Sequence, residues 1–105
     1  MNDYDKGWIS ALTDSEGSLY WERYKRGYEH AYPVISITNT NFLLLLKAQK
    51  LIGGTIFIAP RDKPNHHICW HLVVRFKDWK NWLHEIPLIQ KEVRRQEFLL
   101  WSLQQ

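Results

Sequence analysis

The chain has 105 residues, of which 45% are hydrophobic and 14% aromatic, and its formal net charge is +3. This length predicts one domain over residues 1–105, and the apolar content excludes a disordered protein. A single cysteine, Cys69, excludes an internal disulfide, and the longest apolar run, residues 42–46, is too short to cross a bilayer. We therefore expect a soluble intracellular protein, cytoplasmic or organellar, with no membrane partner.

The first predicted elements are a helix and two strands. Residues 8–16 predict a helix because an apolar segment is followed by Gly17, a stop signal. Residues 18–25 and 32–38 alternate with period two, which predicts two strands joined by a turn at residues 26–29.

A second helix and a second pair of strands follow. The helix begins at Thr40 or Asn41, both good N-caps, and ends at Gly53. Strands are expected over residues 55–59 and 68–76, separated by a Pro-containing turn. The residues that this helix should bury are Leu44, Leu45, Ala48, Leu51 and Ile52.

Two helices are predicted in the last third. Asp78 should cap a short helix, which Pro87 terminates. A final helix is expected over residues 88–103. The apolar residues expected to be buried in these helices are Trp79, Trp82, Leu83, Ile86, Ile89, Val93, Leu100 and Leu103.

The end of the first helix is the most informative segment, and residues 9–17 read Ile-Ser-Ala-Leu-Thr-Asp-Ser-Glu-Gly. Ala11 and Ser15 are four residues apart, so they share a face that permits close approach of another helix. Glu16 lies at the C-terminal end, where the helix dipole disfavours a carboxylate. A divalent cation would compensate for this, while an ordinary surface helix with a Glu-Gly stop is the plain alternative.

This segment resembles the LAGLIDADG motif of homing endonucleases. Ser10 and Ala11 occupy the small-residue positions, Glu16 occupies the acidic position that binds metal in the family, and Thr13 departs from the usual aliphatic residue. The predicted order αββαββα is also that of a LAGLIDADG domain, so the resemblance covers nearly the whole chain. It implies an α+β fold, with an antiparallel saddle-shaped sheet and helices on one face.

The resemblance implies a sequence-specific double-strand DNA endonuclease that hydrolyses phosphodiesters with Mg²⁺. The family uses two motif helices packed together, and this chain has one motif, so we expect a homodimer on a long pseudo-palindromic site. The residues expected at the dimer contact are Trp8, Ser10, Ala11, Leu12 and Ser15.

The catalytic residues implied by the resemblance are Glu16, Asn39 and Lys91. Glu16 and the Ser15 carbonyl would bind Mg²⁺, because this ion prefers oxygen ligands and retains several waters. Arg94 is an alternative to Lys91 as the basic residue, since counting from Pro87 and counting back from Gln96 give different positions.

Asp14 stands two residues before Glu16 and so points elsewhere on the helix. It could bind metal or act as a local hydrogen-bond partner, and the sequence leaves both roles open.

The concave face of the sheet would contact double-stranded DNA. Arg and His can read base edges in the major groove, and Tyr can contact bases or phosphate. The alternation predicts that this face carries Ser18, Tyr20, Glu22, Tyr24, Arg26, His30, Tyr32, Ser36, Thr55, Phe57, Arg61, His67, His71 and Arg75. The opposite face should carry Ile56, Ile58, Ile68, Trp70, Leu72 and Val74 for the core. A one-residue slip would exchange the two faces.

The charge distribution and the Cys and His residues bear on other functions. The basic excess lies in residues 54–105, with eight Lys and Arg against five Asp and Glu, but a mixed-charge surface explains it equally well. Cys69 with His66, His67 and His71 does not complete a zinc site, and no nucleophile-elbow motif is present. A non-cleaving nucleic-acid-binding protein of the same fold, such as an intron RNA maturase, is the first alternative. A protein-interaction module is the second.

Overall fold

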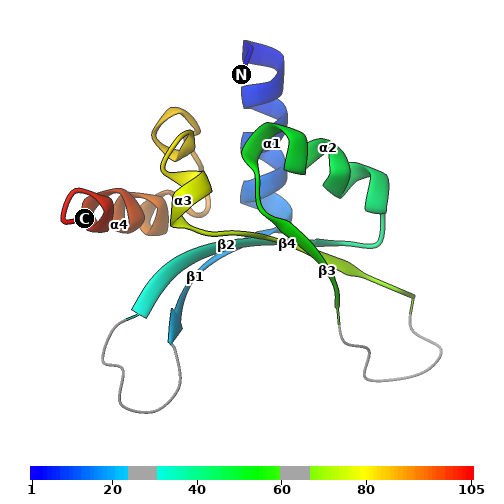
Figure 1. Ribbon diagram of the computed structural model, residues 1–105. Coiled ribbons are helices and arrows are strands. Elements are labelled where there is room, and N and C mark those ends of the chain that lie inside the picture. The colour runs from blue at the N-terminus through cyan, green and yellow to red at the C-terminus, as the bar shows by residue number, and fades with distance from the viewer. Residues whose placement is uncertain (24–30, 60–66) are drawn as a thin grey trace.

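The computed structural model describes residues 1–23, 31–59 and 67–105, and these form one antiparallel sheet covered by helices on one face (Figure 1). The α+β fold and the order of helices and strands are therefore as predicted. The elements are α1 (Asp3–Glu16), β1 (Gly17–Arg23), β2 (Ala31–Asn39), α2 (Phe42–Ile52), β3 (Thr55–Ile58), β4 (Trp70–Val74), α3 (Phe76–Trp79), the 3₁₀ turn η1 (Leu83–Glu85) and α4 (Glu92–Ser102).

The four strands lie in the order β1-β2-β4-β3, and every neighbouring pair is antiparallel. The sheet arches, so that its helix-free face is concave (Figure 1). Gly17 pairs with Ile37, and Ile37 pairs with Leu72. Directly paired residues share a face, and this register puts the buried aliphatic residues of three strands under the helices. The predicted alternation is thereby confirmed.

Local signals in the sequence explain where the long helices begin and end. The Asn2 side chain accepts a hydrogen bond from the Asp5 N–H at 2.8 Å, which starts α1 at Asp3, five residues before the predicted start. Asn41 caps α2 by accepting from the Leu44 N–H at 3.2 Å. Gly53 ends α2 with a φ of 79°, a left-handed conformation that favours glycine.

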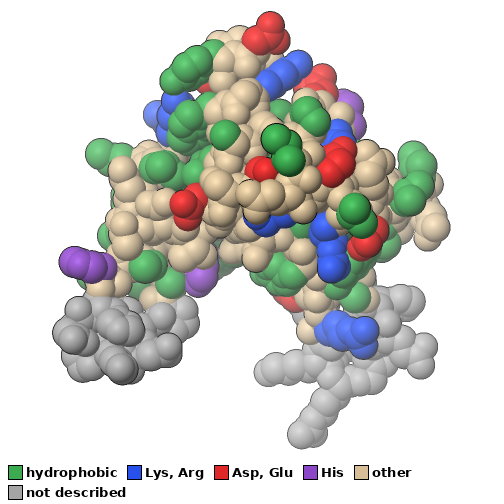
Figure 2. All heavy atoms as spheres, turned by 180° about the vertical axis from the view of Figure 1, so that it is seen from behind, with side chains coloured by type: hydrophobic (Ala, Val, Ile, Leu, Met, Phe, Trp, Pro, Cys, Tyr) green, Lys and Arg blue, Asp and Glu red, His purple; other side chains and the backbone are tan. Residues whose placement is uncertain are grey.

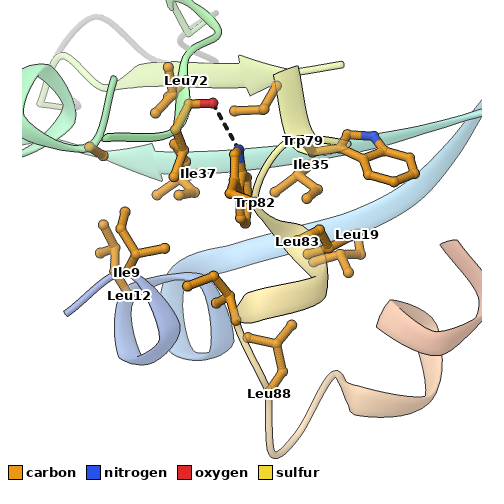
Figure 3. Packing of buried hydrophobic residues seen from close by; sticks show 14 of the residues in the cluster. Ile9, Leu12, Leu19, Ile35, Ile37, Leu72, Trp79, Trp82, Leu83 and Leu88 are labelled. Carbon is orange, nitrogen blue, oxygen red and sulfur yellow. Dashed lines mark hydrogen bonds between the residues drawn. The ribbon is translucent and has the colours of Figure 1, made fainter. Parts of the chain in front are cut away.

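The core lies between the sheet and the helices, where Ile9 and Leu12 of α1 meet Ile37 and Leu72 (Figure 3). Trp82 is buried with them, and its indole N–H donates to the Ile52 carbonyl at 3.0 Å, the dashed line in Figure 3. A buried indole needs such an acceptor, since a lost hydrogen bond would offset part of the burial energy.

The predicted buried stripe of α4 is wrong. Ile89 is 90% exposed and Leu103 is 81% exposed, and Val93 and Leu100 are exposed as well. Phe98 lies in the core instead, stacked on Trp79 with ring centroids 5.6 Å apart. The helix also begins at Glu92, four residues later than expected.

Arg95 shares the buried side of α4. Its guanidinium donates to the Leu83 carbonyl at 3.0 Å and the His84 carbonyl at 2.8 Å, and it pairs with Glu92 at 2.5 Å. A buried charge is costly unless it is paired and hydrogen-bonded, and these acceptors meet that requirement. They fix which side of α4 faces inward.

Two smaller expectations also fail. Asp78 does not cap a helix, because α3 begins at Phe76 and the Asp78 carboxylate accepts from the Gly54 N–H at 3.2 Å. Ile58 is 72% exposed and Ile68 is also exposed, although Ile58 has the predicted core-facing register. Within the described ranges, no helix has the length and apolar character needed to cross a membrane.

Candidate functional site

The C-terminal end of α1 meets the sheet at Glu16. The Gly17 N–H donates to the Thr13 carbonyl, and a Cβ at Gly17 would lie 2.5 Å from that oxygen, so glycine is required by the close approach. The chain then turns directly into β1, the edge strand of the arch (Figure 1). Glu16 is exposed, and its carboxylate has no hydrogen-bond or ion-pair partner among residues 1–23, 31–59 and 67–105.

Asp14 has a different environment. Its carboxylate accepts hydrogen bonds from the backbone N–H groups of Ile89 at 3.2 Å, Gln90 at 2.9 Å and Lys91 at 3.1 Å. Partial desolvation raises the pKa of Asp14, but these N–H groups together with the Lys91 charge outweigh it and hold the pKa below its usual 3.8. Of the two roles left open for Asp14, the structure shows the hydrogen-bonding one.

Lys91 and Arg94, the two candidates for the catalytic basic residue, make different contacts. The Lys91 ammonium donates to the carbonyl of Asp14, which places it at the end of the motif helix. Arg94 instead forms an i,i+3 ion pair with Glu97 at 3.6 Å. The structure therefore places Lys91 closer to the backbone that carries Glu16, while the catalytic role of either residue stays a prediction.

Asn39 and Ser15 are both engaged in local hydrogen bonds. The Asn39 carboxamide oxygen accepts from the Asn41 N–H at 2.8 Å, in the turn that leads into α2. Because β2 continues two residues beyond the pairing of Gly17 with Ile37, Asn39 lies at the end of the sheet where α1 ends. The Ser15 hydroxyl donates back to the Ala11 carbonyl at 2.7 Å, so only its carbonyl remains a candidate metal ligand.

The oxygen donors near Glu16 are of the type that binds a divalent metal. Among the residues that the structure describes, no three His, Cys, Asp or Glu side chains lie together in a way that could hold a metal ion. One subunit offers the Glu16 carboxylate and neighbouring backbone oxygen, which are hard ligands of the type that Mg²⁺ prefers. The chemistry of the donors fits Mg²⁺, which keeps several of its own waters and therefore needs few protein ligands.

The outer face of α1 carries small residues that the described part of the chain does not cover, and the half-buried Trp8 lies beside them. Gly7, Ala11 and Ser15 are exposed and follow one another at intervals of four residues. The ammonium of Lys47 lies 4.2 Å from the Trp8 ring centroid and holds that ring against α2.

Two residues predicted at the dimer contact lie inward. Leu12 belongs to the hydrophobic core of its own chain. The Ser10 hydroxyl donates to the Pro87 carbonyl. Of the predicted contact residues, Ala11 and Ser15 are exposed on the outer face, while Trp8 is half-buried and packs against the core.

The helix-free face of the sheet carries the side chains that the alternation assigned to it. The pairs Ser18 with Ser36 and Glu22 with Tyr32 face the concave side, and Tyr20 lies between them. His71 of β4 shares this face, and its Nδ1 lies 2.6 Å from the Thr38 hydroxyl. Thr38 was not among the residues predicted for the site. The alternation of β2 could have identified Thr38, because it follows Ser36 by two.

Arg75 follows β4 and reaches across the concave face to Glu22 of β1, with Nη1 3.0 Å from the carboxylate. Desolvation first, and then the Glu22 charge, raise the pKa of Tyr20 against a smaller opposing effect of Arg75. His67 is described and exposed. Four other predicted DNA contacts lie outside the described residues, namely Tyr24, Arg26, His30 and Arg61.

A cleft of about 350 Å³ opens beside the start of β1. It is lined by Ser18, Leu19, Gln90, Lys91, Val93, Arg94 and Glu97. Over the view in Figure 2, basic and acidic side chains are interspersed, so the modest net charge is not gathered into a patch of one sign on that side. Specific side chains, more than bulk charge, must define any binding site there.

No family model matches the sequence, and no curated protein matches it. Solved structures do match. The archaeal intron-encoded homing endonuclease I-Vdi141I, complexed with DNA, superposes with a TM-score of 0.66 at 22% identity, over 91% of this chain and 65% of that one. The LAGLIDADG homing endonuclease I-GzeII, in complex with a DNA target, gives 0.66 at 19% identity, over 92% and 33%. The fold is that of LAGLIDADG homing endonucleases.

A third neighbour with this LAGLIDADG fold is the homing endonuclease I-CvuI. It matches with a TM-score of 0.65 at 17% identity, over 89% of this chain and 62% of that chain. Its DNA complexes were determined with 2 mM Mg and with 2 mM Ca. This chain thus spans less than two thirds of the length of these neighbours.

Proposed function

We propose that this protein is a sequence-specific, divalent-metal-dependent DNA endonuclease that acts as a homodimer. The observation that carries the proposal is Glu16, an exposed carboxylate without a partner in the described ranges, at the point where α1 ends and β1 begins. A structural role does not require an acidic side chain at this helix end, where the dipole disfavours it. The DNA complexes of the structural neighbours support the choice of substrate.

The outer face of α1 supports the homodimer. An isologous contact through Gly7, Ala11 and Ser15 would let two copies of α1 approach closely, because none of these residues has a large side chain. Glu16 is the last residue of α1 and directly follows Ser15. A two-fold axis along this face would therefore bring the two Glu16 carboxylates near each other. This would supply the second acidic ligand that one chain lacks.

The chemistry proposed is phosphodiester hydrolysis on two strands. When bound, Mg²⁺ neutralises charge that develops on the phosphate and lowers the pKa of the attacking water. Glu16 and the Ser15 carbonyl would hold the ion. Lys91, fixed by its bond to the carbonyl of Asp14, would place a positive charge beside the reacting phosphate, and Asn39 would orient solvent at the end of β2.

Recognition would come from the concave face. Its rows of Ser, Tyr, Glu, His and Arg side chains can combine phosphate contacts with hydrogen bonds to base edges in the major groove. Two copies related by a two-fold axis would read two half-sites, which predicts a pseudo-palindromic target.

The test is incubation of the purified protein with a randomised duplex library and Mg²⁺, followed by sequencing of the cut ends, with a parallel run in Ca²⁺. We expect cuts within a long pseudo-palindromic site in Mg²⁺, and binding with little or no cutting in Ca²⁺. Sedimentation in the same buffer should give a dimer. Specific binding with no cutting in Mg²⁺ would instead establish a non-cleaving nucleic-acid-binding protein, and a stable monomer on DNA would contradict the shared site.

A further inference from the structure

Glu22 and Arg75 form an ion pair on the concave face, although they come from distant parts of the chain. Glu22 lies on β1, Arg75 follows β4, and β2 runs between these two strands. Nη1 of Arg75 lies 3.0 Å from one carboxylate oxygen and 3.1 Å from the other. The charge-assisted pair therefore spans three strands of the sheet.

The pair changes the surface beneath it. Val34 points to the concave side, in the row between Tyr20 and Arg75, yet it is only 1% exposed. To reach Glu22, the Arg75 side chain passes over the row that holds Val34, so its aliphatic stem lies on the side of the sheet to which this apolar residue points. The guanidinium head is held by the carboxylate, while the side chain as a whole stays 45% exposed.

A carboxylate here is unexpected on a surface that binds DNA. A phosphate backbone repels it, and a solvent-exposed ion pair contributes little to stability. Both oxygens contact the same nitrogen, while Nη2 and Nε of Arg75 make no hydrogen bond to any residue that the structure describes. The arrangement therefore holds one end of the guanidinium and leaves its other donors free.

Arg75 also lines a shallow hollow of about 140 Å³ on the β3 side of β4, together with Gly54, Thr55, Phe57, Val73, Lys77 and Asp78, whereas its guanidinium head points the other way, toward β1. A guanidinium with two free donors is complementary to guanine, which presents O6 and N7 as adjacent acceptors in the major groove. Since Nη1 is already held by Glu22, less conformational entropy would be lost on binding than for an unpaired arginine.

Building on the function proposed above, we infer that Arg75 reads a guanine in each half-site and that Glu22 is the positioning residue that orients it. Arg75 makes the base contact, and Glu22 acts through Arg75 without contacting DNA. The negative charge of Glu22 weakens the attraction of this face for phosphate, so Glu22 increases specificity at the expense of affinity.

The experiment measures base preference and affinity separately. A randomised duplex library is selected for binding in Ca²⁺, and the bound fraction is sequenced for the unmodified protein and for three variants. Arg75→Lys keeps the charge and most of the stem but removes the planar fork, so preference for guanine at one position should fall roughly tenfold, with affinity for random duplex nearly unchanged.

Glu22→Gln should reduce preference at that same position by about threefold or more, because a neutral partner holds the guanidinium more weakly. Affinity for random duplex should rise, since one negative charge is lost. Glu85→Gln makes the same change of charge on η1, in the helical layer, and should leave the preference unchanged.

Two results would overturn the inference while leaving the proposed function intact: an unchanged profile for Arg75→Lys, or a profile of Glu22→Gln that matches Glu85→Gln while Arg75→Lys loses its preferred base. Failure of the unmodified protein to enrich any sequence would overturn the proposed function itself.

Discussion

The two sides of the α1 end carry one carboxylate each, and the structure treats them in opposite ways. On the inner side, the Asp14 carboxylate accepts from the backbone N–H groups of residues 89–91. On the outer side, Glu16 is exposed and has no partner within the described part of the chain. Asp14 and Glu16 are only two residues apart on the helix, yet the first carboxylate helps to hold the fold together and the second is available to a ligand.

The largest effect expected from this comparison is on cleavage. Glu16→Gln keeps the shape of the side chain but removes the charge proposed to bind Mg²⁺, so the cleavage rate should fall roughly a thousandfold or more. Thermal unfolding should be unchanged, because no described residue depends on this carboxylate. A nuclease assay and a melting curve on one preparation test both halves, and full activity in Glu16→Gln would remove Glu16 from the site.

The second expectation compares two neighbouring residues of α1: Leu12 on its inner side and Ala11 on its outer side. Leu12→Ala should lower the free energy of unfolding by about 2–5 kcal/mol, because it opens a cavity in the core. Ala11→Phe should leave the fold of the subunit intact but block close approach of a second α1. Urea denaturation and sedimentation velocity distinguish these outcomes, and an Ala11→Phe dimer as stable as the unmodified one would place the contact elsewhere.

The third expectation concerns acid. Because the pKa of Asp14 in the folded protein is lower than its usual 3.8, its contribution to stability is present above that pH and is lost as pH falls through and below it. Urea midpoints measured from pH 6 downward should therefore decline below about pH 4. Asp14→Asn should be less stable at pH 6 and show a shallower decline, with the remaining slope arising partly from Glu92, whose pKa is also lowered. Equal slopes in the two proteins would contradict the assignment.

The smallest expected change is a gain in stability. The Thr13 hydroxyl is buried between the two carboxylate-bearing faces of α1 and has no hydrogen-bond partner among the described residues. Thr13→Val removes this unsatisfied group while nearly keeping its shape, so it should stabilise the protein by about 1 kcal/mol. A loss of stability, measured by urea denaturation, would show that the hydroxyl is satisfied in solution.

Much of the fold could be predicted because its signals are local. Period-two alternation gave the two faces of the sheet, and Asn41 and Gly53 marked the ends of α2. The same logic failed for α4, where Val93 and Leu100, expected to be buried, are exposed. Periodicity shows that a helix has an apolar face, but the carbonyl partners of Arg95, which decided the orientation, belong to η1 and are invisible in a helical pattern.

The site was predictable to a similar degree. Glu16 could be singled out from its position at a helix end, because the motif is contiguous. The role of Asp14 could not be decided, since its partners lie some 75 residues further along the chain. Likewise, Lys91 is distinguished from Arg94 only by the hydrogen bond from its ammonium to the Asp14 carbonyl, which the sequence does not reveal.

The hydrogen bond from Gln90 to Asp14 also bears on the order of folding, since it joins residues 76 positions apart in a chain of 105. Closing so long a loop costs chain entropy that a few hydrogen bonds do not recover unless the intervening strands are already assembled. The junction between α1 and the segment before α4 is therefore a late-forming part of the molecule. By the same reasoning, its amides should exchange with solvent through small openings before those of the central strands β2 and β4 do.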